Sequence, residues 1–246
     1  YSNGWSHITS HLDATDITSD TQKVYVSTAG GLLILDKESH QLSMLNANNG
    51  LYPADLKSIY IDSRNNILLG SNGPDPSIQV IDSNYAHINT VYLNGIQGLR
   101  QIIDIIKYNN NIYALGRGSD IDFFIEFRYD NEGYLYYQTV LNLPIQDIST
   151  IYDLDIINDE LFITTNKGIV HGISSNNQIS WSVYDLVDLD KTFFNNNYLF
   201  GYEFRGEPII DIINSSNDDF NIVTTQSLYR VFESDTVKIF DCPYES

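Results

Sequence analysis

Cysteine, basic residues and long apolar runs are all scarce in this 246-residue chain. A single cysteine, Cys242, excludes a disulfide framework and a multi-cysteine metal site. Lys and Arg number 13 against 32 Asp and Glu, which gives a formal net charge of −19. Nucleic acid and anionic lipid surfaces require basic patches, so the sequence predicts neither as a partner. No stretch approaches the roughly 18 uninterrupted apolar residues of a membrane span, so we expect no membrane insertion.

Signatures of catalysis are also missing. The five histidines are scattered, and the chain contains no G-x-S-x-G, H-E-x-x-H or phosphate-binding G-x-x-x-x-G-K-[ST] motif. The sequence therefore predicts a protein that is not an enzyme and needs no cofactor. The enzymatic alternative is a five-bladed glycosidase, whose carboxylates would meet at the mouth of a central channel and include a Glu acid. The glutamates of this chain fall mostly in turns or outer strands.

The chain does contain a repeated two-strand pattern. A short Ile-rich strand, a polar turn and an apolar strand ending in small residues recur five times. The second strands have their central residues at Tyr25, Leu68, Tyr113, Phe162 and Ile222. These positions are 43, 45, 49 and 60 residues apart, a period that fits one four-stranded propeller blade.

The repeat predicts an all-β fold, a β-propeller of four-stranded antiparallel blades. We expect a single domain over residues 1–246, either five-bladed or part of a larger propeller. Several strands are apolar on both faces, as at Ile102-Ile103, which is typical of blades stacked face to face and disfavours the alternative of a β-sandwich. The five units are predicted at about 14–46, 56–93, 101–143, 150–186 and 208–241, with an insertion at 191–207.

Motifs at the unit junctions resemble a known repeat. Asn49-Gly50-Leu51, followed by the strand Asn66–Ser71, is similar to the two-component regulator propeller repeat, and Asn94-Gly95-Ile96 repeats the opening. The stretches Gly4–Thr9 and Gly30–Leu32 also resemble the first propeller of large secreted proteins from Bacteroidetes-like bacteria, which are associated with type IX secretion. The resemblance implies an extracytoplasmic location, whether secreted, periplasmic or at the cell surface.

That resemblance implies an interaction domain. The leading hypothesis is a recognition module that binds a protein, peptide or glycan through loops on one face of the propeller. The alternatives are a structural spacer domain in a multidomain surface protein and the five-bladed glycosidase.

Aspartates recur at one position of the first strands. Asp16, Asp104, Asp153 and Asp211 occupy it in four units, and Ser58 occupies it in the second. First strands line the channel of a propeller, so four carboxylates would converge there and suit Ca²⁺, which takes oxygen ligands. Alternatively, each carboxylate accepts backbone N–H groups from the neighbouring blade or contacts channel water.

The insertion at 191–207 is rich in aromatic residues. Tyr198, Tyr202, Phe204 and Arg205 follow the run Asn195–Asn197. Aromatic rings stack on apolar sugar faces, and Asn and Arg bond hydroxyl and carbonyl groups, so these four residues are candidate ligand-binding residues. The alternative is an extra β-hairpin whose aromatic side chains pack on a blade edge.

Overall fold

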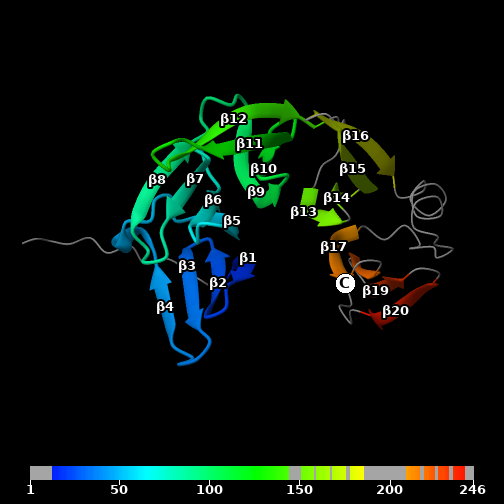
Figure 1. The fold of residues 1–246 in the computed structure, drawn as a ribbon, viewed down its shortest axis with the longest axis horizontal. Helices are drawn as coiled ribbons and strands as arrows, with labels where there is room; N and C mark the ends of the chain where they lie inside the picture. Colours follow the sequence, from blue (N-terminus) through cyan, green and yellow to red (C-terminus); the bar gives the residue numbers. More distant parts are fainter. Residues whose placement is uncertain are drawn as a thin grey trace, which may run out of the picture. The chain divides into compact units, whose positions relative to one another are not determined.

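The structure is a computed structural model that describes residues 13–143, 151–157, 159–166, 168–175, 178–185, 209–216, 219–224, 227–232 and 235–241. These residues form five four-stranded antiparallel sheets, and in each sheet the strands lie in chain order (Figure 1). In the described residues the one helical element is the short 3-10 turn η1 (Ala47–Asn49). The prediction of an all-β chain built from five four-stranded antiparallel blades is confirmed.

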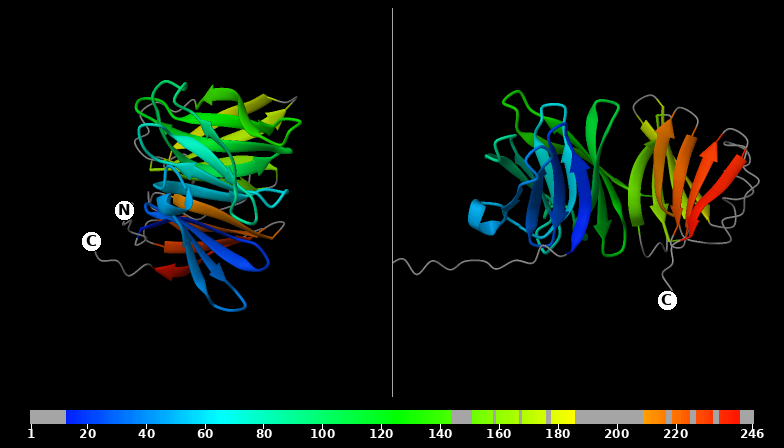
Figure 2. Two further views of the ribbon diagram at one scale, coloured as in Figure 1. Left: turned by 90° about the vertical axis from the view of Figure 1, so that its left-hand side faces the viewer. Right: turned by 90° about the horizontal axis from the view of Figure 1, so that it is seen from below.

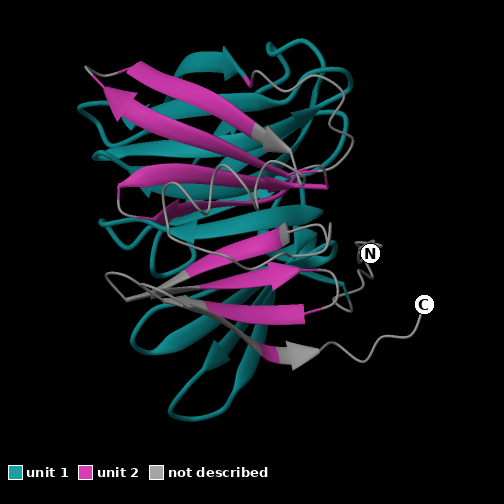
Figure 3. Cartoon of the chain, turned by 90° about the vertical axis from the view of Figure 1, so that its right-hand side faces the viewer, with its two compact units in different colours: residues 1–142 teal, residues 143–246 magenta. Residues whose placement is uncertain are grey.

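By its internal contacts the chain divides into two compact units, residues 1–142 and 143–246 (Figure 3). The first unit holds three blades, and Figure 2 shows the four strands of its first blade as neighbours in one twisted sheet. Blade 1 contains β1 (Ala14–Ser19), β2 (Lys23–Thr28), β3 (Gly31–Asp36) and β4 (Leu42–Leu45). Blade 2 contains β5 (Leu56–Ile61), β6 (Ile67–Ser71), β7 (Ser77–Ile81) and β8 (His87–Tyr92). Blade 3 contains β9 (Leu99–Tyr108), β10 (Asn111–Gly118), β11 (Phe123–Tyr129) and β12 (Leu135–Asn142).

The second unit holds the other two blades. Blade 4 contains β13 (Ile151–Ile157), β14 (Glu160–Thr165), β15 (Gly168–Ser175) and β16 (Gln178–Asp185). Blade 5 contains β17 (Ile209–Ser216), β18 (Asp219–Thr224), β19 (Ser227–Phe232) and β20 (Asp235–Asp241).

Blade 2 shows why its strands are apolar on both faces. Along β6, Ile67 and Leu69 belong to the core shared with blade 1, whereas Leu68 belongs to the core shared with blade 3. Successive side chains of a strand point to opposite faces, so one strand supplies both cores. All three side chains are at most 1% exposed. Full burial of such a side chain contributes about 1.5–3 kcal/mol, so the two cores hold blades 1, 2 and 3 together.

The N-G-L motif ends η1. The Asn49 side chain accepts a hydrogen bond from the backbone N–H of Asn46, and Gly50 adopts φ 89°, a left-handed conformation that favours glycine. The chain thereby turns so that Leu51, 4% exposed, enters the core between blades 1 and 2. Asn and Gly set the turn, and Leu anchors it.

An aspartate opens several of the hairpin turns. The carboxylates of Asp62, Asp82 and Asp130 each accept the backbone N–H groups two and four residues further along the chain. In all three turns the residue three positions after the Asp has a positive φ. A carboxylate that bonds nearby N–H groups stabilises such a turn, so part of the large negative charge serves local structure.

The register expected for the fifth unit is wrong by one residue. The hydroxyls of Thr28, Thr165 and Thr224 each donate to a carbonyl three residues later, which marks equivalent ends of β2, β14 and β18. Counting back from Thr224, the residue equivalent to Phe162 is Asn221, and not Ile222. In the sequence, Thr224-Thr225 resembles the pair Thr164-Thr165 that ends β14, so the pattern places Thr225 where Thr224 belongs. A shift of one residue moves every side chain to the opposite face of its strand.

Candidate functional site

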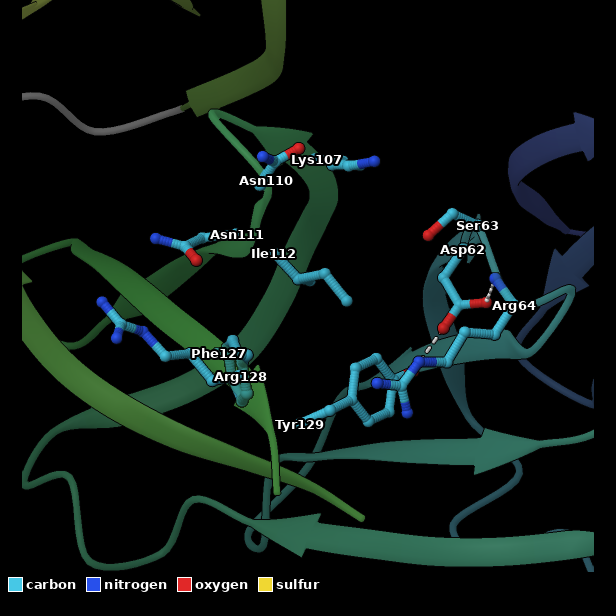
Figure 4. Close-up of a pocket in the computed structure, with 10 residues that line it drawn as sticks. All are labelled: Asp62, Ser63, Arg64, Lys107, Asn110, Asn111, Ile112, Phe127, Arg128 and Tyr129. Carbon is cyan, nitrogen blue, oxygen red and sulfur yellow. Dashed lines mark hydrogen bonds between the residues drawn. The ribbon is translucent and has the colours of Figure 1, made fainter. Parts of the chain in front are cut away.

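A pocket of about 300 Å³ lies between blades 2 and 3 of the first unit (Figure 4). We call it the blade 2–3 pocket. Three segments form it: the β5–β6 turn, the β9–β10 turn with the adjoining strand ends, and the last residues of β11. The lining residues are Asp62, Ser63, Arg64, Lys107, Asn110, Asn111, Ile112, Phe127, Arg128 and Tyr129.

Asp62 anchors one wall. Its side chain is buried, at 6% exposed, and one carboxylate oxygen accepts the backbone N–H groups of Arg64 and Asn66, each at 2.8 Å. The other oxygen accepts the Asn66 amide at 3.2 Å and the Tyr129 hydroxyl. Four donors therefore satisfy this buried carboxylate, which joins the turn of blade 2 to the third strand of blade 3.

Tyr129 holds its proton in this arrangement. Burial, and then the hydrogen bond to the Asp62 carboxylate, raise the pKa of the Tyr129 hydroxyl. Its ring lies under the Arg64 guanidinium, whose central carbon is 4.1 Å from the ring centroid (Figure 4). This cation–π contact and the backbone bond to Asp62 both orient Arg64 at the wall. Among the described residues the guanidinium has no hydrogen-bond or ion-pair partner.

The β9–β10 turn supplies the opposite wall. Asn109 and Asn110 have φ of 46° and 68°, and two successive residues of positive φ are typical of the tight type I′ hairpin turn. Lys107, near the end of β9, and Asn110 on this turn are exposed. Within the part of the chain that the structure describes, neither side chain makes a hydrogen bond or an ion pair.

Arg128 is neutralised locally. Its guanidinium pairs with Glu126 at 2.7 Å, and the same carboxylate oxygen accepts the Asn111 amide at 3.0 Å. In Figure 4 the Arg128 and Asn111 side chains extend away from Arg64. Half of the Arg128 side chain is exposed, so solvent screens this pair and it contributes little to stability.

The pocket floor is apolar. Ile112 and Phe127 are 7% and 0% exposed and belong to the core shared by blades 2 and 3. An apolar floor with a rim of polar side chains is the usual composition of a small-ligand site. Reasoning from the sequence missed this pocket, because its basic residues Arg64, Lys107 and Arg128 lie far apart along the chain.

The aspartates of the first strands lie at one equivalent position. Asp16, Asp153 and Asp211 each directly follow a β-bulge in β1, β13 and β17, as Ser58 does in β5 and Asp104 in β9. A bulge bends a strand and re-aims its side chains. The recurrence therefore explains why this position carries Asp in four of the five blades.

Asp16 satisfies its carboxylate locally. One oxygen accepts the N–H of Ile17 at 2.6 Å, and the other accepts the N–H of Ile59 in blade 2 at 2.8 Å. Burial raises the pKa of the Asp16 carboxyl. The Asp104 carboxylate likewise accepts the N–H of Ile105. Among the described residues no three His, Cys, Asp or Glu side chains form a metal-binding group. Ca²⁺ binding by Asp16, Asp104, Asp153 and Asp211 stays a prediction.

The aromatic insertion lies outside the described residues. Tyr198, Tyr202, Phe204 and Arg205 all fall within the range 186–208, which the structure does not describe. Their role in ligand binding stays a prediction.

In the described residues no helix has the length and apolar character of a membrane span.

Comparison with known proteins identifies the fold. No protein-family model and no curated protein sequence matches this chain. Among solved structures it is similar to the WD40 β-propeller domain of Doa1, with a TM-score of 0.57, 12% identity, and coverage of 93% of this chain and 68% of that one. It is also similar to a protein considered a 6-phosphogluconolactonase from Bacteroides fragilis, with a TM-score of 0.56, 11% identity, and coverage of 95% and 67%.

A third similar structure is an extracellular domain. It comes from a protein considered a hybrid two-component system of B. thetaiotaomicron, with a TM-score of 0.55, 12% identity, and coverage of 92% of this chain and 35% of that one. This chain therefore spans about one third of that extracellular domain. At such identities the likeness concerns the fold alone, and it confirms the predicted β-propeller class.

Proposed function

We propose that this chain is an extracytoplasmic recognition module that binds a protein, peptide or glycan in the blade 2–3 pocket. The observation that carries the proposal is the pocket itself, which has an apolar floor and a polar rim on which Lys107, Asn110 and the Arg64 guanidinium have no hydrogen-bond or ion-pair partner among the described residues. The similarity to extracellular domains of Bacteroides regulatory proteins supports a location that is secreted, periplasmic or at the cell surface. More specifically, we propose that the chain belongs to the two-component regulator propellers and that the protein is exported by type IX secretion.

Binding rather than catalysis fits the pocket chemistry. A glycosidase needs two carboxylates, about 5–10 Å apart, that can exchange protons with substrate or water. The pocket is lined by one carboxylate, that of Asp62, and four hydrogen-bond donors occupy it. Its role is to hold Arg64 and Tyr129 in place. We therefore infer a protein that is not an enzyme.

Pocket size favours a small ligand group. A volume of about 300 Å³ lies at the lower end of the roughly 300–1,000 Å³ found for ligand pockets. One sugar ring or one side chain of a larger partner fits such a space. The propeller supplies a rigid scaffold, and the turns carry the contacts.

The test is a binding screen with a pocket-filling variant. Ser63 is exposed on the pocket wall, so Ser63→Trp fills the pocket without disturbing the core. Ser83 has the same place in the β7–β8 turn, directly after Asp82, and is also exposed, so Ser83→Trp is the matched control.

Wild type and both variants are applied to a glycan array and a peptide library. We expect hits with wild type and Ser83→Trp that are lost with Ser63→Trp. Hits that survive Ser63→Trp would place the binding surface elsewhere, and an absence of any hit with wild type would favour the structural spacer.

A further inference from the structure

Positive charge gathers at the blade 2–3 pocket of a strongly acidic chain. Three of the 13 Lys and Arg residues line the pocket, namely Arg64, Lys107 and Arg128, against one acidic residue, Asp62. The formal charge of the lining is therefore +2, in a chain of −19. Even when Glu126 is included as the partner of Arg128, the charge of this group stays at +1.

Within the described part of the chain, two of these cations have no counter-ion. Arg128 is paired with Glu126, but Lys107 and Arg64 have no ion-pair partner among the described residues. The Asp62 carboxylate does not serve them as one, because its oxygens bond backbone N–H groups, Asn66 and Tyr129. Figure 4 shows Lys107 and Arg64 on segments of different blades, with Ile112 pointing into the space between these segments. An anionic group that enters this space meets a cation on each wall, and each cation can offer it a charge-assisted hydrogen bond.

The pocket lining also contains neutral side chains that can donate hydrogen bonds. Ser63 and Asn110 are exposed on the rim, and neither side chain makes a hydrogen bond within the described part of the chain. Hydroxyl and amide groups pair with the hydroxyls of a sugar, because both kinds of group donate and accept. The apolar Ile112 side chain offers a surface for a ring face.

We propose that the blade 2–3 pocket binds an acidic saccharide, with the carboxylate or sulfate of one sugar residue held between Lys107 and Arg64. This inference rests on the proposed function and narrows its ligand. The charge of −19 on the whole chain repels long polyanions. The ligand is therefore a short oligosaccharide or a chain end with one acidic group in the pocket.

A matched pair of sugars tests the acidic group. Methyl glucuronide and methyl glucoside differ only at C6, where one carries a carboxylate and the other a hydroxymethyl group. Their affinities are measured by NMR titration for wild type, Lys107→Gln and Arg100→Gln. Arg100 is exposed near the other end of the same strand, β9, so Arg100→Gln controls for the change in net charge. Glucose 6-sulfate and an N-acetylated, C-amidated glutamate are the further probes.

We expect wild type and Arg100→Gln to bind the glucuronide, or the sulfate if that is the group recognised, at least tenfold more tightly than the glucoside. Lys107→Gln is expected to abolish this preference, since the loss of one charged hydrogen bond weakens binding by roughly 10- to 100-fold.

Equal affinity for the acidic and the neutral sugar would overturn this inference and leave the proposed function standing. Tighter binding of the glutamate probe would overturn the saccharide assignment, as would no binding of any anionic probe. The proposed function itself is refuted by a different result, namely array hits that persist with Ser63→Trp.

Discussion

Tyr129→Phe removes one hydrogen bond from a buried carboxylate and leaves the rest of the pocket wall in place. Asp62 keeps its three other donors, from Arg64 and Asn66. The phenyl ring remains under the Arg64 guanidinium, so the packing and the cation–π contact persist. A hydrogen bond to a charged group contributes about 1.5–3 kcal/mol to stability. At about 2–4 °C per kcal/mol for a chain of this size, the melting temperature falls by about 3–12 °C.

Thermal unfolding followed by circular dichroism measures the change, and Tyr136→Phe is the control. Tyr136 is 41% exposed, and its hydroxyl donates to Gln138 at the surface, so its replacement changes stability by less than about 0.5 kcal/mol. Equal melting temperatures for the two variants would refute the anchoring role of the bond between Tyr129 and Asp62.

We also predict that the loss of stability caused by Tyr129→Phe depends on pH. The pKa of Tyr129 is raised in the folded state, so the stabilisation linked to its proton is complete below the unfolded pKa of about 10 and is lost as pH rises through the folded pKa. The difference in stability between wild type and Tyr129→Phe is therefore expected to be constant up to about pH 10 and to shrink above it. Urea unfolding at pH 7 and above pH 10 checks the sign.

The remaining predictions concern the core, the first strands and the insertion. Leu68→Ala is expected to destabilise the protein by about 2–5 kcal/mol, because Leu68 is fully buried, whereas Leu42→Ala, at 62% exposed, is expected to change little; equal urea midpoints would contradict this. Asp16→Ala is expected to lower the free energy of unfolding by about 1–3 kcal/mol with or without Ca²⁺, because Asp16 accepts the N–H of Ile59. A rise in melting temperature with Ca²⁺ that Asp104→Asn and Asp153→Asn remove would support the metal site instead. Alanine at Tyr198, Tyr202 and Arg205 tests the insertion as a second binding surface: a loss of affinity for hits that survive Ser63→Trp, with little loss of stability, would support it, and unchanged affinity would argue for a structural hairpin.

The blades could be predicted because each level of the sequence agrees. The strand period, the polar turns and the burial of both strand faces in blade 2 all lead to the same meander. The fifth unit shows where this reasoning fails. Its hairpin carries a second irregularity, between Asn214 and Ser216, and the doubled threonine at 224–225 hides the extra residue. Hydrogen bonding by Thr224, which the sequence does not display, reveals the true register.

The pocket could not be predicted in the same way, because its residues come from two blades. Arg64 and Lys107 are 43 positions apart, and Tyr129 is a further 22 along the chain. Their proximity depends on how β5 and β9 pack together, which no local pattern encodes. The shared position of the aspartates in the first strands could be predicted, because equivalent positions of a repeat occupy the same place in each blade. For Asp16 the structure matches the alternative given from the sequence, because its carboxylate accepts the backbone N–H of Ile59 in the neighbouring blade.

The central claim, that the blade 2–3 pocket is the ligand site, is tested most directly by NMR with isotope-labelled protein and a ligand from the screen. The signals to follow are the Arg64 Nε–H, the Asn110 side-chain amide and the backbone amide of Ser63, which all belong to the pocket lining. We predict that the largest shift changes occur at these groups and that Ser63→Trp abolishes the changes at Arg64 and Asn110. Shift changes confined to residues 191–207, or to any surface away from blades 2 and 3, would contradict the account.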